Sequence, residues 1–120
     1  MGQIHIYTGE NQKNLKTAHG MALRACGAGF SVGFYSFGEK SADIQILGNR
    51  LPNFQILENS FQDVSHLDMI ILYDCHLAEH NSLQNFIDNK PQNIEIVLFG
   101  TAFSDDVLTK ADLVSEIAAF

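Results

Sequence analysis

A short polar loop between a buried strand and a helix is the sequence feature that most constrains the fold of this chain. Residues 4–7 predict the strand, residues 8–14 the loop, and residues 15–26 the helix. The helix is predicted by residues three and four positions apart that share one face: Leu15, Ala18, His19, Ala22, Leu23 and Cys26. Asn14 is the expected N-cap, and the glycines at positions 27 and 29 can end the helix.

The same loop predicts a binding site. Gly9 opens it, and such loops bind phosphate in α/β proteins because backbone N–H groups and the positive end of the helix dipole converge there. The expected phosphate loop comprises Thr8, Gly9, Glu10, Asn11, Gln12, Lys13, Asn14, Leu15 and Lys16.

Three ordered segments resemble the ATP:corrinoid adenosyltransferase family. In the first, Tyr7-Thr8-Gly9 is followed at residues 20–29 by a helix similar to the family's Gly-x-Ala-Leu-Arg-Ala helix. In the second, residues 67–74 resemble the family's Asp-Leu-Val-Val-Leu-Asp-Glu strand, and residues 89–101 resemble its Asn-Arg-Pro…Leu-Thr-Gly-Arg. In the third, residues 111–117 resemble Ala-Asp-Leu-Val-Thr-Glu-Met.

The resemblance implies a three-layer α/β fold of the P-loop NTPase type, with a mainly parallel sheet of about five or six strands. It also implies Mg·ATP and cobalamin as ligands, and a homodimer. The remaining sequence fits such a sheet, because apolar strands alternate with helices. Further strands are expected at residues 30–37, 54–57, 69–72, 94–99 and 113–117.

Two more helices are expected in the second half of the chain. One begins with Asn81 or Ser82 as its cap and ends before Pro91, and a short one begins at Ser104. Residues 38–66 carry no resemblance to the family, and residues 44–47 form only a short apolar stretch.

The phosphate-binding residues of the family are replaced here. Its loop glycines fall on Asn11 and Lys13, its phosphate-clamping lysine on Asn14, and its Mg²⁺-binding Ser/Thr on Leu15. Its acidic pair falls on Tyr73-Asp74, so the first carboxylate is lost. One preorganised group of this kind is typically worth on the order of 3 kcal/mol in the transition state.

Two hypotheses follow from these replacements. The first is a non-catalytic homologue that binds a nucleotide, a corrinoid or a protein partner weakly at the degenerate loop. The alternative is an active ATP:cob(I)alamin adenosyltransferase with an altered phosphate loop.

Composition bears on the number of domains, the class of partner and the location of the protein. The 120 residues, 46% hydrophobic, predict a single domain over residues 1–120. The net charge of −7 argues against nucleic acid and anionic membranes as partners, since both attract positive surfaces. Two cysteines form no disulfide framework, and no membrane span or signal peptide is recognisable, so a reducing cytoplasmic setting is expected.

Other candidate residues have competing interpretations. His76, Glu79 and His80 match the His-x-x-Glu-His signature of a zinc peptidase class, with Cys75 adjacent, but the segment also fits a solvated loop, and no metal site is predicted. Asp74 could orient a metal or water, or face solvent. Four aromatic residues could stack on a flat ligand or belong to the core: Tyr7, Phe34, Phe37 and Phe99.

Overall fold

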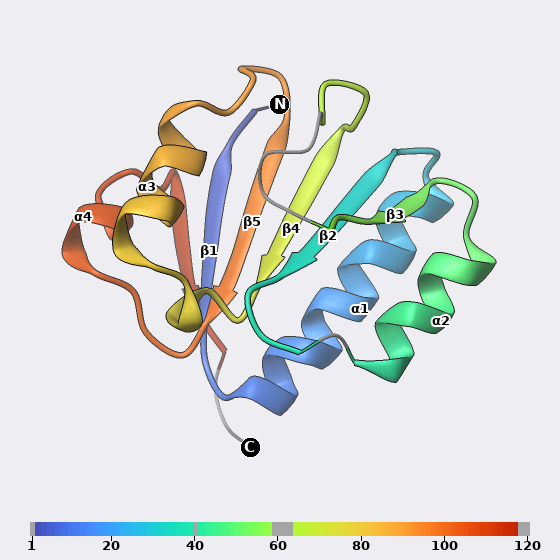
Figure 1. Cartoon of the computed structure of the whole chain (residues 1–120), viewed down its shortest axis with the longest axis horizontal. Helices are drawn as coiled ribbons and strands as arrows, with labels where there is room; N and C mark the ends of the chain where they lie inside the picture. Colours follow the sequence, from blue (N-terminus) through green and yellow to red (C-terminus); the bar gives the residue numbers. More distant parts are fainter. Residues whose placement is uncertain (1, 40, 59–63, 118–120) are drawn as a thin grey trace.

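The computed structural model describes residues 2–39, 41–58 and 64–117, and within them six parallel strands form one sheet (Figure 1). The strands are β1 (Ile4–Thr8), β2 (Val32–Ser36), β3 (Phe54–Ile56), β4 (Met69–Tyr73), β5 (Glu95–Gly100) and β6 (Leu113–Glu116). Their order across the sheet is β3-β2-β4-β5-β1-β6. The predicted α/β fold with a mainly parallel sheet of about five or six strands is therefore confirmed.

The helices cover the two faces of the sheet in pairs. They are α1 (Asn11–Gly27), α2 (Ala42–Arg50), α3 (His80–Asp88) and α4 (Asp105–Leu108), with a 3-10 turn η1 (Cys75–Leu77) before α3. In Figure 1, α1 and α2 lie together beside β2 and β3, whereas α3 and α4 lie beside β1 and the far edge. The result is a three-layer arrangement.

The central strands build one core on each face, because their successive side chains point in opposite directions. In β4, Ile70 and Leu72 join a core with residues of α3 and α4, and Ile71 and Tyr73 join a second core with residues of α1 and α2. β5 alternates in the same way, with Leu98 in the first core. Because both faces of these strands are buried, β4 and β5 need continuous runs of apolar residues.

The start of α1 differs from the prediction. The helix begins at Asn11, four residues earlier than expected, and its N-cap is Glu10, so Asn14 is not the cap. Each glycine in a helix costs roughly 1 kcal/mol relative to alanine, and residues 11–19 contain no glycine. The helix can therefore extend toward β1.

The other elements follow the predictions more closely. α3 begins at His80 with Glu79 as its N-cap, so the caps expected at Asn81 or Ser82 are wrong. Ser104 caps α4 as expected, by accepting a hydrogen bond from Val107 N. No helix was predicted from the sequence at α2. The Ser41 hydroxyl caps this helix by accepting a hydrogen bond from Ile44 N at 3.1 Å.

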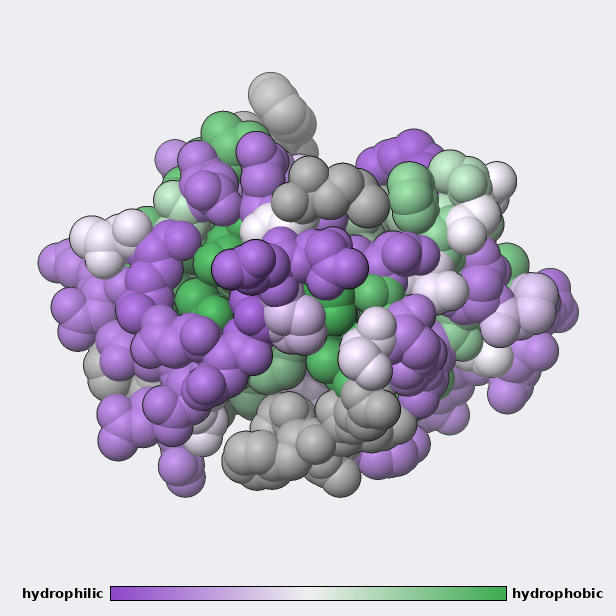
Figure 2. Space-filling view, turned by 90° about the horizontal axis from the view of Figure 1, so that it is seen from above, coloured by the Kyte–Doolittle hydropathy of each residue, from purple (hydrophilic) through white to green (hydrophobic). Residues whose placement is uncertain are grey.

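Polar residues dominate the face of the molecule drawn in Figure 2. Seen from above, the end at which the strands begin is mostly hydrophilic, with apolar side chains visible in narrow gaps (Figure 2). Among the described helices, none has both the length and the apolar character needed to cross a bilayer.

We predict opposite effects for two glycine-to-alanine substitutions. At Gly33 in β2, an added Cβ would lie 2.5 Å from Leu67 Cδ1 and 3.2 Å from Leu57 Cδ1, so two buried leucines must repack. Gly33→Ala should lower the free energy of unfolding by about 1–3 kcal/mol. Gly27→Ala, at the last residue of α1, meets nothing within 4 Å and should raise it by up to about 1 kcal/mol.

Urea unfolding of both variants and the unchanged protein measures these differences. Equal stability of the Gly33 and Gly27 variants would contradict the packing described for β2.

Candidate functional site

The carboxyl edge of the sheet is where the connections of neighbouring strands separate. The chain leaves β1 and β2 toward α1 and α2 on one face, and leaves β4 and β5 toward α3 and α4 on the other. β1 lies next to β5, and β2 lies next to β4. Open α/β sheets bind ligands in the crevice that forms where adjacent connections part in this way.

The connection between β1 and α1 is short. Thr8 ends β1, pairing with Gly100 on one side and Glu116 on the other, and only Gly9 and Glu10 separate it from the helix. The residues expected to form the rest of the phosphate loop, Asn11 to Lys16, are the first residues of α1. Two residues are too few to wrap a phosphate chain in the way expected of the loop.

Asn14 ties the ends of β1 and β5 together. Its side chain is 1% exposed, and its Nδ2 donates to Gly9 O at 3.0 Å and to Gly100 O at 3.3 Å. Gly9 N donates to the same Gly100 O at 3.2 Å. The Asn14 amide group therefore binds the protein's own backbone.

Charge at the start of α1 also disfavours an anion. Glu10 is the N-cap and is exposed, and its side chain makes no capping hydrogen bond. A carboxylate there interacts favourably with the helix dipole and repels a phosphate that approaches the same end. Lys16 is exposed on the helix, and Lys13 is half-buried.

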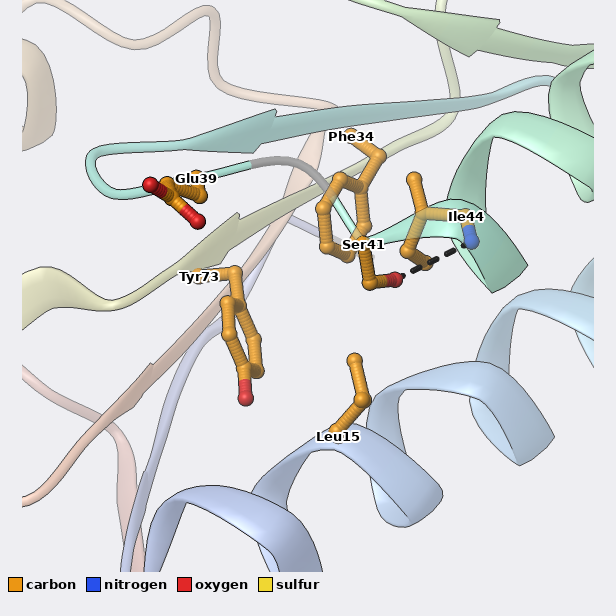
Figure 3. Close-up of a pocket in the computed structure, with 6 residues that line it drawn as sticks. All are labelled: Leu15, Phe34, Glu39, Ser41, Ile44 and Tyr73. Carbon is orange, nitrogen blue, oxygen red and sulfur yellow. Dashed lines mark hydrogen bonds between the residues drawn. The ribbon is translucent and has the colours of Figure 1, made fainter.

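A cavity of about 230 Å³ lies between α1, α2 and the carboxyl ends of β2 and β4 (Figure 3). It is lined by Leu15, Phe34, Glu39, Ser41, Ile44 and Tyr73. The structure thus brings together Leu15 and Tyr73, two of the site positions predicted from the sequence. Asp74, the second member of the former acidic pair, is not among the lining residues.

The cavity wall is mostly apolar and aromatic. Phe34 and Ile44 are each 1% exposed, and the rings of Phe34 and Tyr73 stack with centroids 5.9 Å apart. Sequence reasoning raised Phe34 as a stacking residue but missed Glu39, Ser41 and Ile44 as site residues. The helix-capping pattern at Ser41 was the available signal for that segment.

Burial controls the ionisation of Tyr73. Removal from water raises the pKa of its phenol to about 12, and the nearby negative charge of Asp74 adds to the effect. Burial also raises the pKa of the Asp74 carboxyl, against an opposing effect of His76. Asp74 has a left-handed backbone (φ 56°), and a Cβ added to Gly38 would collide with its carboxylate.

The zinc-type signature does not lie on one helix. His76 belongs to η1, Glu79 is the N-cap of α3, and His80 is its first residue. The His76 ring instead accepts a hydrogen bond from Thr101 N through Nδ1, at 3.3 Å. In the described part of the chain, no three histidine, cysteine or acidic side chains are grouped as a metal site requires.

The two cysteines are buried free thiols. Cys75 Sγ donates to Leu72 O at 3.4 Å, and burial raises the pKa of its thiol well above the ordinary value. Burial also raises the pKa of the Cys26 thiol. Both side chains act here as small apolar residues.

Comparison of the sequence with known protein families and with curated proteins finds no match. The fold and the geometry at the carboxyl edge therefore define a parallel α/β domain with a small cavity at a ligand-binding position.

We predict that the Asn14 amide contributes measurably to stability. Asn14→Ala removes one buried and one partly buried hydrogen bond and should lower the free energy of unfolding by about 1–3 kcal/mol. Asn89→Ala is the matched control, because it removes an exposed hydrogen bond from the Asn89 side-chain amide to Asn85 O. It should lower the free energy of unfolding by about 0.5 kcal/mol or less. If urea unfolding showed that Asn14→Ala and Asn89→Ala lower the free energy of unfolding equally, the role given to Asn14 would be contradicted.

We also predict a pH effect from Tyr73. In the unfolded chain its phenol ionises near its ordinary pKa of 10, whereas in the folded protein it keeps its proton up to about pH 12. The free energy of unfolding should therefore be unaffected by Tyr73 below pH 10 and fall as the pH rises from 10 to 12. Tyr73→Phe lacks this part of the decline. Identical pH slopes for the two proteins in urea unfolding would contradict the assignment.

Proposed function

We propose that the chain is a non-catalytic relative of the ATP:corrinoid adenosyltransferases that binds a small molecule at the carboxyl edge of its sheet. The observation that carries the proposal is the Asn14 amide, which binds Gly9 O and Gly100 O where the family places its phosphate-clamping lysine. A residue held in this way supplies no positive charge to a triphosphate leaving group.

Mg·ATP does not fit the residues at this edge. Leu15 has no oxygen ligand and Tyr73 offers a neutral phenol in place of a carboxylate, and both line a mostly apolar cavity. Hard cations such as Mg²⁺ require oxygen ligands and keep several waters. Together with the short Gly9-Glu10 connection, this removes three of the contributions on which adenosyl transfer depends, each on the order of 3 kcal/mol.

The active enzyme was the alternative that the sequence left open, and no arrangement among the described residues favours it. Cobalamin binding, a homodimer and a cytoplasmic location are implied by the resemblance or by composition, and they remain predictions. Nucleic acid is disfavoured as a partner by the net charge of −7.

We predict that millimolar Mg·ATP leaves the melting temperature unchanged. A ligand at 100 times its dissociation constant would stabilise the fold by about 2.7 kcal/mol, which corresponds to several degrees. Incubation of the protein with cob(I)alamin and Mg·ATP should likewise yield no adenosylcobalamin above a protein-free control.

Either a several-degree rise with Mg·ATP or enzyme-catalysed formation of adenosylcobalamin would overturn the proposal. The absorbance change of the corrinoid follows the second reaction directly, so the two measurements are independent.

A further inference from the structure

We propose that the cavity lined by Leu15, Phe34, Glu39, Ser41, Ile44 and Tyr73 binds a small aromatic amine of about one ring. The inference rests on the proposed function, because it names the ligand class of the same edge of the sheet. Four arguments support it: position, size, wall chemistry and charge.

The position is the one at which open α/β sheets take ligands. β2 continues toward α2 on one face, and its neighbour β4 continues toward η1 and α3 on the other. The cavity lies at this separation, beside the carboxyl ends of both strands.

The size of the cavity limits the ligand. An apolar cavity of about 150 Å³ in another protein takes up benzene, and pockets for drug-sized ligands begin at roughly 300 Å³. At about 230 Å³, this cavity has room for one ring and a short substituent. A nucleoside triphosphate or a corrinoid is far too large for it.

The wall fits an aromatic ring. Figure 3 shows Phe34, Leu15 and Tyr73, from β2, α1 and β4, around a common space. Phe34 and Tyr73 already stack on each other, and aromatic pairs gain roughly 0.5–1.5 kcal/mol beyond area burial, so a third ring adds contacts of the same kind.

The polar groups of the lining favour a cation. Glu39 is exposed, and it is the one charged residue among the described residues that line the cavity. Ser41 already accepts the hydrogen bond that caps α2. The net charge of −7 also attracts a cation and repels an anion. An ammonium group beside Glu39 satisfies these conditions, whereas a carboxylate or phosphate does not.

Phenethylamine is the probe. It is added to the ¹⁵N-labelled protein at low salt, and amide chemical shifts give both the location and the dissociation constant. Phenethyl alcohol tests the charge, 3-phenylpropionate reverses it, and butylamine removes the ring. We expect phenethylamine to bind most tightly and to shift amides of β2, β4 and the start of α2.

Two pairs of variants test the wall and the charge. Leu15→Phe fills the cavity and should weaken phenethylamine binding at least tenfold, whereas Leu23→Phe, on the same helix but 49% exposed, should leave it unchanged. Glu39→Gln should weaken binding on the order of threefold and reduce its salt dependence. Glu116→Gln, an exposed glutamate on β6, is the control.

Absence of phenethylamine binding, or binding that neither Leu15→Phe nor Glu39→Gln weakens, overturns this inference. Tighter binding of 3-phenylpropionate than of phenethylamine also overturns it. Glu39→Gln changes an exposed residue, so it remains informative even if Leu15→Phe unfolds the chain. Adenosyl transfer or Mg·ATP binding would instead overturn the proposed function, whatever the amine does.

Discussion

The burial of β4 and β5 on both faces is the constraint on which the rest of the structure depends. Their alternate side chains enter two separate cores, one with α1 and α2 and one with α3 and α4. Helices must therefore cover both faces, and the connections leave toward opposite faces at β2 and β4 and at β5 and β1. The crevice at the carboxyl edge follows from the way the sheet is covered, before any functional residue is considered.

What occupies that edge is decided by a few side chains. Asn14 fastens the end of β1 to the end of β5, and α1 begins so early that only Gly9 and Glu10 connect strand and helix. A loop built for phosphate leaves backbone N–H groups open to its ligand, whereas this connection is held by a side chain that bonds to the backbone carbonyls around it. Leu15 and Tyr73 present mostly apolar surface to the neighbouring cavity.

Local sequence signals were sufficient to predict the strands and most of the helices. The run 69–72 in β4 reads as a two-sided buried strand from its composition alone, and Ser104 identifies the start of α4. The start of α1 was wrong because Asn14 is a good capping residue in isolation. Its actual partners are Gly9 O and Gly100 O, and Gly100 lies 86 positions away in sequence. Local reasoning has no access to a partner at that separation.

The sequence by itself determined the parallel α/β class and the alternation of strands and helices. These properties depend on periodicity, on turn and cap residues, and on side-chain type at single positions. Only the tertiary structure decided that Asn14 is buried, that His76 accepts a hydrogen bond from Thr101 N, and that Leu15, Phe34 and Tyr73 line one cavity. Each of these depends on how β2, β4 and β5 align in the sheet and how α1 and α2 pack on it, because segments distant in the chain meet only after the sheet has formed.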